Sequence, residues 1–385
     1  MIVIDEAAYR ETIALLEKLV SIRSANPPGN ENEIASAVKE LLAANGIDST
    51  LVPLSEGRSS LVARIPGRES GSIVLCGHLD TVNADEEKWT TPPFKPRIEN
   101  DRMWGLGSAD MKSGVATIIE IALLIARSGV VPKKDIILAL TADEEHAYSG
   151  AALVAESELI DDAQFLLITE PTAGKAYCGQ KGELWVEAKF SGKAAHGSVP
   201  ETGVSAILPA MRFCLSLNER AKKFAEHPGR GRTSLNIGQF NGGWQVNIVP
   251  DTAVVKLDIR VVSMEDKEMV LEIIEQLGNE EAEREGARFS MNVFAYKDPI
   301  VSDADDPYVQ AFLSTVAGGG ELPKAEIAPY STDAVEIVPR IKVPVVIYGP
   351  GSIAQAHQPD EYLELSSLRR ALKVIGAFVS DASWK

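Results

Sequence analysis

Short runs of apolar, mostly branched residues are the feature that most limits how this chain can fold. Four of them occur in the first half of the sequence, at residues 61–65, 72–76, 136–140 and 165–168. An unbroken apolar run of this length is typical of a strand that is buried on both faces. Helical patterns precede and separate the runs, as over residues 111–126. We therefore expect an α/β fold with a doubly wound, mostly parallel sheet.

The pattern changes in the middle of the chain and then returns. Residues 178–294 combine alternating strand-like segments with helical stretches, which is typical of an α+β domain. From residue 295 onward the α/β pattern resumes, with an apolar strand at 343–348 and a closing helix at 365–378. The sequence therefore predicts a discontinuous domain, 1–177 and 295–385, that is interrupted by an inserted α+β domain over 178–294.

Charge and hydropathy exclude several classes of partner. The chain carries 38 basic and 55 acidic residues, a net charge of −17, which repels phosphate backbones and anionic lipid surfaces. We expect no binding to nucleic acid or membranes. The longest apolar stretch, 115–126, is interrupted by Glu120 and is shorter than the ~20 residues that span a bilayer. Asp5 and Glu6 stand where a secretory signal would be basic, so we expect a cytoplasmic protein.

The first candidate site residues follow the run at 72–76. His78 and Asp80 are one residue apart, a spacing that lets an imidazole bind a metal ion while a carboxylate holds its other ring nitrogen. The alternative is a hydrogen-bonded histidine in a turn. Asp110 lies in a glycine-rich loop before the expected helix at 111, where its alternative role is to cap that helix. The signatures of serine hydrolases, P-loop proteins and dinucleotide-binding proteins do not occur in the sequence.

Three further strands also end in possible ligands. These are Glu144 and Glu145 after 136–140, Glu170 after 165–168, and His357 after 343–348. Each could be an ordinary solvated side chain, but independent residues have no reason to recur at the same end of successive strands, where α/β sheets place their ligands. Two histidines and several carboxylates without thiolates suit two metal ions with a bridging carboxylate. Such a pair would share a hydroxide, and an unligated carboxylate would act as the base.

Combined in this order, these segments resemble the dinuclear zinc peptidase and deacylase family M20, which includes acetylornithine deacetylase, succinyl-diaminopimelate desuccinylase, aminoacylase and glutamate carboxypeptidase. The resemblance extends over nearly the whole chain. It is carried by Gly-His-Leu-Asp-Thr-Val at 77–82, the glycine-rich loop 105–114, Ala-Asp-Glu-Glu at 142–145, Glu-Pro-Thr at 170–172, Ala-His-Gly at 195–197, Asn-Ile-Val-Pro at 247–250 and residues 356–363.

The resemblance implies a role for each candidate residue. His78 and Glu170 would bind one metal ion, Glu145 and His357 the other, and Asp110 would bridge the two. The ions would be zinc, with cobalt or manganese as possible replacements. Asp80 would orient His78. Glu144 would be the general base that activates the bridging water and passes its proton to the leaving amine.

The inserted domain has an implied role as well. His196 would stabilise the tetrahedral oxyanion, in its own subunit or in that of a partner; without the resemblance it is simply a surface histidine. The insertion itself would be a lid and the interface of a homodimer. Because His357 lies 187 residues after Glu170, the chain must leave the sheet and return to complete the site.

The resemblance also narrows the reaction. The segment from Gly351 to residue 363 is most similar to acetylornithine deacetylases, so we expect removal of the acetyl group from N-acetylornithine. Desuccinylase, aminoacylase or glutamate-type carboxypeptidase activity is the alternative, and a non-catalytic binding protein is the alternative of another class. Arg260 and Asn247 would receive the substrate carboxylate, although Arg260 could equally be a surface cation. Gly351 and Asp333 would also contact the substrate. Asp333 stands where the acetylornithine deacetylases have a glutamate, and its shorter side chain is a departure from the pattern that implies ornithine as the substrate.

Overall fold

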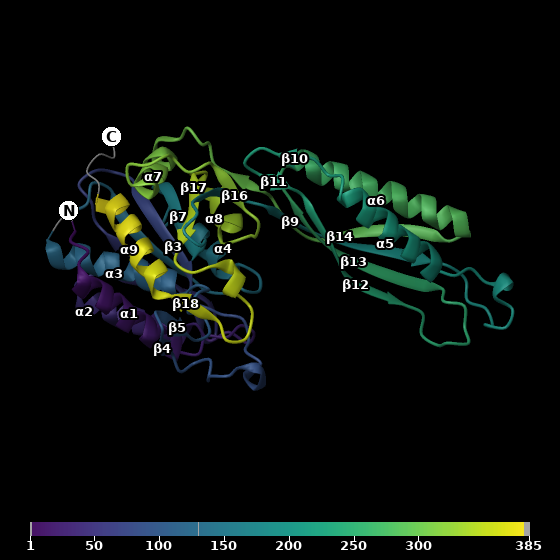
Figure 1. Ribbon diagram of the computed structural model, residues 1–385, viewed down its shortest axis with the longest axis horizontal. Helices are drawn as coiled ribbons and strands as arrows, with labels where there is room; N and C mark the ends of the chain where they lie inside the picture. Colours follow the sequence, from purple (N-terminus) through teal and green to yellow (C-terminus); the bar gives the residue numbers. More distant parts are fainter. Residues whose placement is uncertain (1, 130, 381–385) are drawn as a thin grey trace. The chain divides into compact units, whose positions relative to one another are not determined.

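The computed structural model describes residues 2–129 and 131–380. The chain divides into two compact units (Figure 1). Unit 1 comprises Met1–Gly179, Val301–Glu326 and Thr332–Lys385, and unit 2 comprises Gln180–Ile300 and Ile327–Ser331. The insertion expected from the sequence spans residues 178–294. Unit 2 spans 180–300 and also includes a second short segment, 327–331.

A central sheet organises unit 1. Its strands lie in the order β1 (Ser49–Ser55), β2 (Arg58–Ile65), β6 (Asp135–Thr141), β3 (Ser72–His78), β7 (Ala163–Pro171), β17 (Val345–Gly349), β8 (Tyr177–Gln180) and β15 (Ile300–Val301), with β16 (Glu326–Ala328) beside β8. The middle strands β6, β3, β7 and β17 run parallel. Strands β1, β2 and β8 are antiparallel to their neighbours. The carboxyl ends of these four middle strands therefore lie at the same edge of the sheet.

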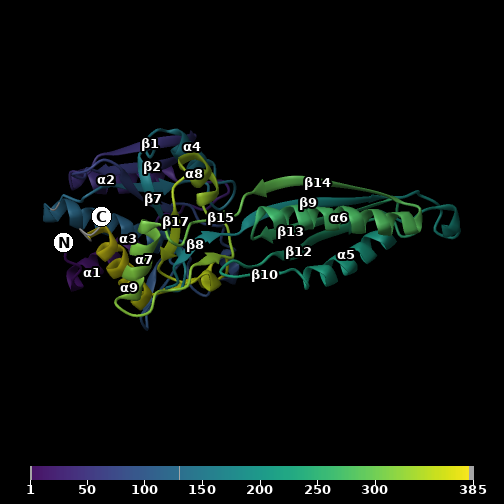
Figure 2. The same cartoon turned by 90° about the horizontal axis from the view of Figure 1, so that it is seen from above.

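Helices cover both faces of this sheet (Figure 2). One face packs against α1 (Glu6–Ser21), α2 (Asn32–Ala44), α3 (Lys112–Ser128), α7 (Pro307–Ala317) and α9 (Leu365–Ser380), and the other against α4 (Ser149–Glu156) and α8 (Ala334–Ile341). Strand β3 is buried along its whole length, which explains why its sequence is continuously apolar instead of alternating. The predicted doubly wound, mostly parallel α/β fold is confirmed.

Helix α3 lies close to strand β7 because Gly114 lies at their contact. A Cβ atom added to Gly114 would lie 2.1 Å from the main-chain oxygen of Thr169, so this approach requires glycine. The helix begins directly after the loop that contains Asp110, and Glu170 follows Thr169. The close packing therefore brings the loop before α3 to the end of β7.

A small three-stranded sheet ties the end of the chain to the same loop. It consists of β18 (Tyr362–Glu364), β5 (Arg102–Trp104) and β4 (Arg97–Glu99). Leu363 pairs with Met103, and both are fully buried. The short helices η1 (Glu86–Lys88) and η3 (Ile353–Gln355) lie in connecting segments. The pairing of β18 with β5 places the residues just before β18 beside the residues just after β5.

Unit 2 is an antiparallel sheet with two helices, in agreement with the predicted α+β insertion. The strand order is β12 (Ser234–Gly242), β13 (Thr252–Val261), β9 (Gly182–Ser191) and β14 (Arg288–Lys297). Burial alternates along β13, as expected for a sheet with one covered face. Helices α5 (Ile207–Ala221) and α6 (Met264–Glu285) pack on that face. A hairpin of β10 (Glu226–His227) and β11 (Gly231–Arg232), and the short helix η2 (Pro200–Thr202), complete the unit.

A search of the described residues for a bilayer-crossing helix finds none that is both long and apolar enough.

Candidate metal centre

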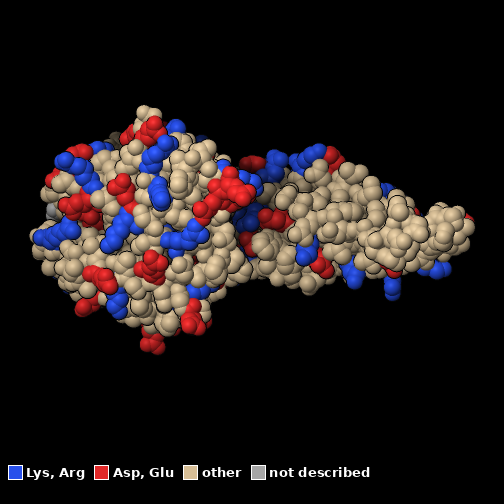
Figure 3. All heavy atoms as spheres, turned by 90° about the horizontal axis from the view of Figure 1, so that it is seen from below, with Lys and Arg blue, Asp and Glu red and all other residues tan. Residues whose placement is uncertain are grey.

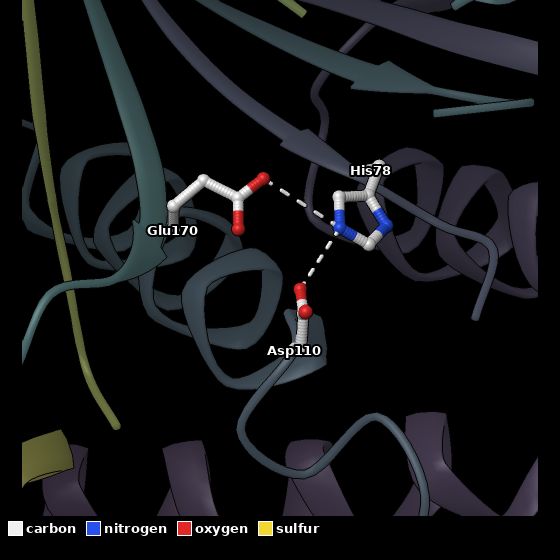
Figure 4. Close-up of side chains that lie close together, drawn as sticks. All are labelled: His78, Asp110 and Glu170. Carbon is white, nitrogen blue, oxygen red and sulfur yellow. Dashed lines mark hydrogen bonds and ion pairs between the residues drawn. The ribbon is translucent and has the colours of Figure 1, made fainter. Parts of the chain in front are cut away.

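The last residue of β3, His78, stands between carboxylates that come from two other segments. Its side chain is buried, and its Nε2 atom lies 3.2 Å from Asp110 Oδ1 and 3.6 Å from Glu170 Oε1. Figure 4 shows the two carboxylates pointing toward the same ring nitrogen. The other ring nitrogen, Nδ1, lies 3.0 Å from the main-chain oxygen of Asp80. That contact fixes the ring with Nε2 toward the carboxylates.

A second group of ligand atoms shares Asp110 with the first. His357 Nε2 lies 2.9 Å from Glu145 Oε2 and 3.6 Å from Asp110 Oδ2. Within each group, His78 with Asp110 and Glu170 or Asp110 with Glu145 and His357, one atom from each side chain lies within 4.8 Å of the others. The structure thus brings together all five side chains that the sequence analysis names as metal ligands, with Asp110 common to both groups.

The sheet explains why residues so distant in sequence meet here. Strands β3, β6 and β7 are parallel neighbours, so the residues after their carboxyl ends lie at one edge, as is usual for ligand sites in such sheets. His78 ends β3, Glu144 and Glu145 follow β6, and Glu170 lies near the end of β7. Strand β17 pairs with β7 and leads to the segment of His357.

The buried glutamates of the site have raised pKa values. Burial and the neighbouring carboxylates raise the pKa of Glu144 and Glu170 well above the ordinary range of a glutamate. Burial and the charge of Asp110 likewise raise the pKa of Glu145. The hydrogen bond with Glu145 raises the pKa of His357 to about 9. Grouped buried carboxylates stay ionised together only when a cation offsets their charge.

The donor set fits divalent metal ions. The Oε1 atom of Glu145 is buried and has no hydrogen-bond partner among the residues that the structure describes, so this oxygen is free to coordinate a cation. All the converging donors are carboxylate oxygens and imidazole nitrogens, which zinc, cobalt and manganese accept. A shared carboxylate flanked by two such groups is the arrangement that two neighbouring ions require.

Asp80 organises the turn that carries Glu144 and Glu145. Its carboxylate accepts hydrogen bonds from the main-chain N–H groups of Glu144, at 3.2 Å, and Glu145, at 3.1 Å. Asn26 Nδ2 donates to the same carboxylate at 2.9 Å. The distance from Asp80 Oδ1 to His78 Nδ1 is 3.7 Å, longer than a hydrogen bond. The contact that orients His78 therefore comes from the main-chain oxygen of Asp80. The side chain of Asp80 instead holds the turn that carries Glu144 and Glu145.

Two residues near the site were not selected from the sequence. Asn26 joins Asp80 to Asp143, to which its Nδ2 atom also donates at 3.0 Å. Glu361 accepts three main-chain N–H groups of the loop that contains Asp110. No spacing or strand-end position distinguishes Asn26 in the sequence. For Glu361 the available signal was its place in the segment 356–363, which carried the family resemblance.

Two expected substrate-binding residues lie in unit 1. Gly351 follows β17 with φ +82°, and a Cβ atom there would lie 3.2 Å from the Cβ of Ala109. Asp333 is only 2% exposed, and Thr141 Oγ1 donates a hydrogen bond to its carboxylate. Burial raises the pKa of Asp333 to about 7. Gly351 is therefore adjacent to the loop that contains Asp110, whereas Asp333 is buried beside Thr141, the last residue of β6.

The other expected residues belong to unit 2. His196 is exposed; its Nδ1 atom lies 2.7 Å from Ser198 Oγ, and its main chain forms a bridge with Ile248. That bridge places it beside Asn247, which is also exposed. Arg260, on β13, forms ion pairs at 2.9 Å with Glu183 and Asp258. Unit 2 thus brings His196 and Asn247 together, while the guanidinium of Arg260 is already paired with carboxylates.

Comparison with known proteins places this site in a family. Residues 74–381 match the family described as Peptidase family M20/M25/M40. A probable succinyl-diaminopimelate desuccinylase of Staphylococcus epidermidis is 29% identical, covering 92% of this chain and 93% of that protein. An acetylornithine deacetylase of Photorhabdus laumondii is 31% identical, covering 90% and 89%. The crystal structure of a tripeptidase from Staphylococcus aureus superposes with a TM-score of 0.82 at 24% identity, covering 97% and 98%. The chain therefore belongs to peptidase family M20/M25/M40 and is an amide hydrolase.

Proposed function

We propose that the protein is a dinuclear metallohydrolase that removes an acyl group from the nitrogen of an amino acid, with N-acetylornithine as its substrate. The observation that carries the proposal is that Asp110 belongs to both possible metal groups, beside Glu144, a buried carboxylate that belongs to neither. A shared ligand and a separate base are what hydrolysis without a covalent intermediate requires.

The five ligand side chains divide between two ions. His78 and Glu170 would hold one ion, Glu145 and His357 the other, and Asp110 would contact both. When bound, such a pair of divalent ions lowers the pKa of water and polarises the carbonyl group that is attacked. Zinc is the first candidate for both ions. The Asp80 carboxylate holds the turn of Glu144 and Glu145 by accepting hydrogen bonds from their main-chain N–H groups. These bonds fix the position of the proposed base relative to the proposed ligand.

Glu144 is suited to moving the proton. Its side chain is 10% exposed, and Glu144 Oε2 lies 3.9 Å from His78 Nε2. Burial raises its pKa, which makes it a better base than an exposed glutamate and lets it hold the proton that it takes from the attacking water. The same carboxylic acid would then deliver that proton to the leaving amine.

The choice of substrate is supported by the sequence around Gly351 and by the likeness to an acetylornithine deacetylase. The comparable likeness to a probable succinyl-diaminopimelate desuccinylase makes desuccinylation the second candidate. We assign the oxyanion contact to His196 and the contacts to the substrate carboxylate to Asn247 and Arg260. Gly351 and Asp333, in unit 1, are the other two residues that we propose to take part in substrate binding.

A hydrolysis panel on zinc-loaded protein tests the substrate. N-acetylornithine, N-succinyl-diaminopimelate, a neutral N-acetyl amino acid and a tripeptide would be compared by their kcat/KM, with the Glu144→Gln variant as the blank. We expect release of free ornithine to have the highest kcat/KM. Faster cleavage of another N-acyl amino acid would replace the substrate but keep the reaction. Faster cleavage of the tripeptide, or no cleavage of any member, would contradict the proposed deacylase.

We also propose that two copies associate through unit 2. Charged side chains are sparse over much of this unit in the view of Figure 3. Leu208, Met211 and Leu215 are spaced along one side of α5 and are 47%, 50% and 68% exposed, and β12 is an edge strand. We expect a dimer in sedimentation equilibrium and a shift toward monomer in the Leu215→Glu variant. A wild-type monomer at all concentrations would contradict this.

A further inference from the structure

The loop that leads to Asp110 has few hydrogen bonds of its own. Residues 105–110 lie between β5 and α3, belong to neither, and are all buried. Buried main-chain N–H groups outside helices and strands need partners from elsewhere, because an unpaired one is costly. Three of those in this loop, on Gly107, Ala109 and Asp110, have a single side chain as their partner.

That side chain is Glu361. Its Oε1 atom accepts from Ala109 N at 2.7 Å and from Asp110 N at 3.0 Å, and its Oε2 atom accepts from Gly107 N at 3.1 Å. Its own main-chain oxygen accepts from Gly105 N at 3.0 Å. The residue is 1% exposed. One glutamate therefore pairs with four N–H groups in six consecutive residues, including the N–H of Asp110 itself.

Glu361 also belongs to the segment that carries His357, four residues earlier. Asp360, one of the three residues between them, is held in place as well, because its Oδ1 atom accepts a hydrogen bond from Thr90 N at 2.8 Å. Asp110 and His357 are far apart in sequence, yet their side chains approach to 3.6 Å. The contact between Glu361 and the loop is thus a direct link between the two segments that supply these side chains.

We propose that Glu361 is a positioning residue that fixes Asp110 relative to His357 and thereby sets the affinity for the ion that Asp110, Glu145 and His357 hold. This inference rests on the proposed function, because it needs the ligand assignment given there. Within residues 2–129 and 131–380, the hydrogen bonds of the Glu361 carboxylate come from main-chain N–H groups, and Glu361 lies outside both ligand groups. Its effect on the ion passes through the loop.

The test is the binding of zinc to metal-free protein, measured by calorimetry with a competing chelator. Glu361→Gln keeps one carbonyl oxygen for Ala109 and Asp110 but places an amide N–H against Gly107 N. Glu361→Ala removes all three bonds. Residues that support metal ligands typically change metal affinity by about 10- to 100-fold when altered. We expect the zinc ion held by Asp110, Glu145 and His357 to be bound about 10-fold more weakly in Glu361→Gln and still more weakly in Glu361→Ala, with the other ion less affected.

Glu364→Gln is the matched control, since Glu364 lies three residues later, is exposed, and pairs with Arg102 at the surface. We expect wild-type zinc affinities for it. Cobalt(II) absorption gives a second measurement that does not depend on turnover. The spectrum of cobalt held by Asp110, Glu145 and His357 should change in the Glu361 variants and remain unchanged in Glu364→Gln. Circular dichroism of each metal-free variant identifies those that fold.

The outcomes separate the two proposals. If wild-type protein binds two zinc ions and Asp110→Asn loses one, while a folded Glu361→Gln variant keeps both affinities and the cobalt spectrum, the positioning role is overturned and the proposed function stands. A lower melting temperature with unchanged zinc affinities would also overturn it, because it would indicate packing alone. If wild-type protein binds no zinc and hydrolyses nothing, both proposals fail together.

Discussion

Single residues in the metal centre divide into those that would hold ions and those that hold the ligands in place. Glu144 and Glu145 are neighbours in sequence, but only Glu145 belongs to a ligand group. The carboxylate of Asp80 accepts a hydrogen bond from the main-chain N–H of each, so the same side chain holds both residues in place. The proposed base and the proposed ligand are therefore consecutive residues of one turn.

The Glu144→Gln variant tests this division. The amide has nearly the same size as the carboxylate but cannot take a proton, and loss of a general base costs about 10²- to 10⁴-fold in rate. We expect turnover to fall by that factor while elemental analysis still finds two ions per chain. Glu156→Gln, at an exposed glutamate, is the control. Near-normal turnover in Glu144→Gln would remove the base from the proposal.

Four of the five ligand candidates stood out in the sequence because they end an apolar strand or occur in the segment that follows one, and Asp110 stood out as the acid of a glycine-rich loop before a helix. Their division between two ions came from the family resemblance. It did not identify Asn26 or the contact of Glu361 with the Asp110 loop. These residues act through hydrogen bonds to a carboxylate or to main-chain N–H groups across distant segments, and such contacts leave no spacing in the chain. They become visible only when the loops are placed in space.

Among the elements, helix α3 lies in the apolar interior of unit 1 and carries one buried acidic residue. Glu120 is 1% exposed, and its Oε1 atom has no hydrogen-bond partner among the described parts of the chain. Burial, with a smaller contribution from the charge of Glu11, raises its pKa from 4.5 to about 7. The folded protein therefore binds more protons than the unfolded chain between these values. The contribution of this residue to stability is complete below about pH 4.5 and is lost as the pH rises through 7.

The Glu120→Gln variant should remove this loss. We expect urea unfolding at pH 8 to give a free energy of unfolding higher than that of the wild type by about 1–3 kcal/mol. At pH 5 the two proteins should differ little. Glu40→Gln, at an exposed glutamate of α2, should follow the wild type at both pH values. Equal stabilities of Glu120→Gln and wild type at pH 8 would contradict the raised pKa.

The elements themselves were predictable to different degrees. Strands β3, β6 and β7 are buried on both faces and so appear as continuous apolar runs. The three-residue strands β5 and β18 were not predicted, because so few residues show no periodicity. Their pairing is set by the tertiary contact of Met103 with Leu363. It is this unpredicted pairing that places Glu361 against the Asp110 loop.

At the scale of the whole molecule, the proposed catalytic residues belong to two units. The ligand groups and Glu144 lie in unit 1, whereas His196 and Asn247 lie in unit 2. Unit 2 has its own buried core, with the rings of Phe190, Phe213 and Phe289 in contact. A change at the exposed His196 should therefore leave both the core of unit 2 and the metal ligands intact.

The His196→Ala variant tests whether unit 2 takes part in the chemistry. Removal of one donor to an oxyanion typically costs about 10²- to 10³-fold in kcat. We expect a fall of that size with unchanged metal content and melting temperature. The control is His227→Ala, at the other histidine of unit 2, which pairs with Asp266. This variant should keep kcat near the wild-type value. Wild-type kinetics in His196→Ala would exclude it from the site.

We propose that five side chains from distant parts of the sequence hold two metal ions, with Asp110 between them. Anomalous diffraction at the zinc edge, from crystals of zinc-loaded protein, tests it most directly. We expect two peaks, both in contact with Asp110, one also in contact with His78 and Glu170 and the other with Glu145 and His357. A single peak, or peaks bound to other residues, would contradict it.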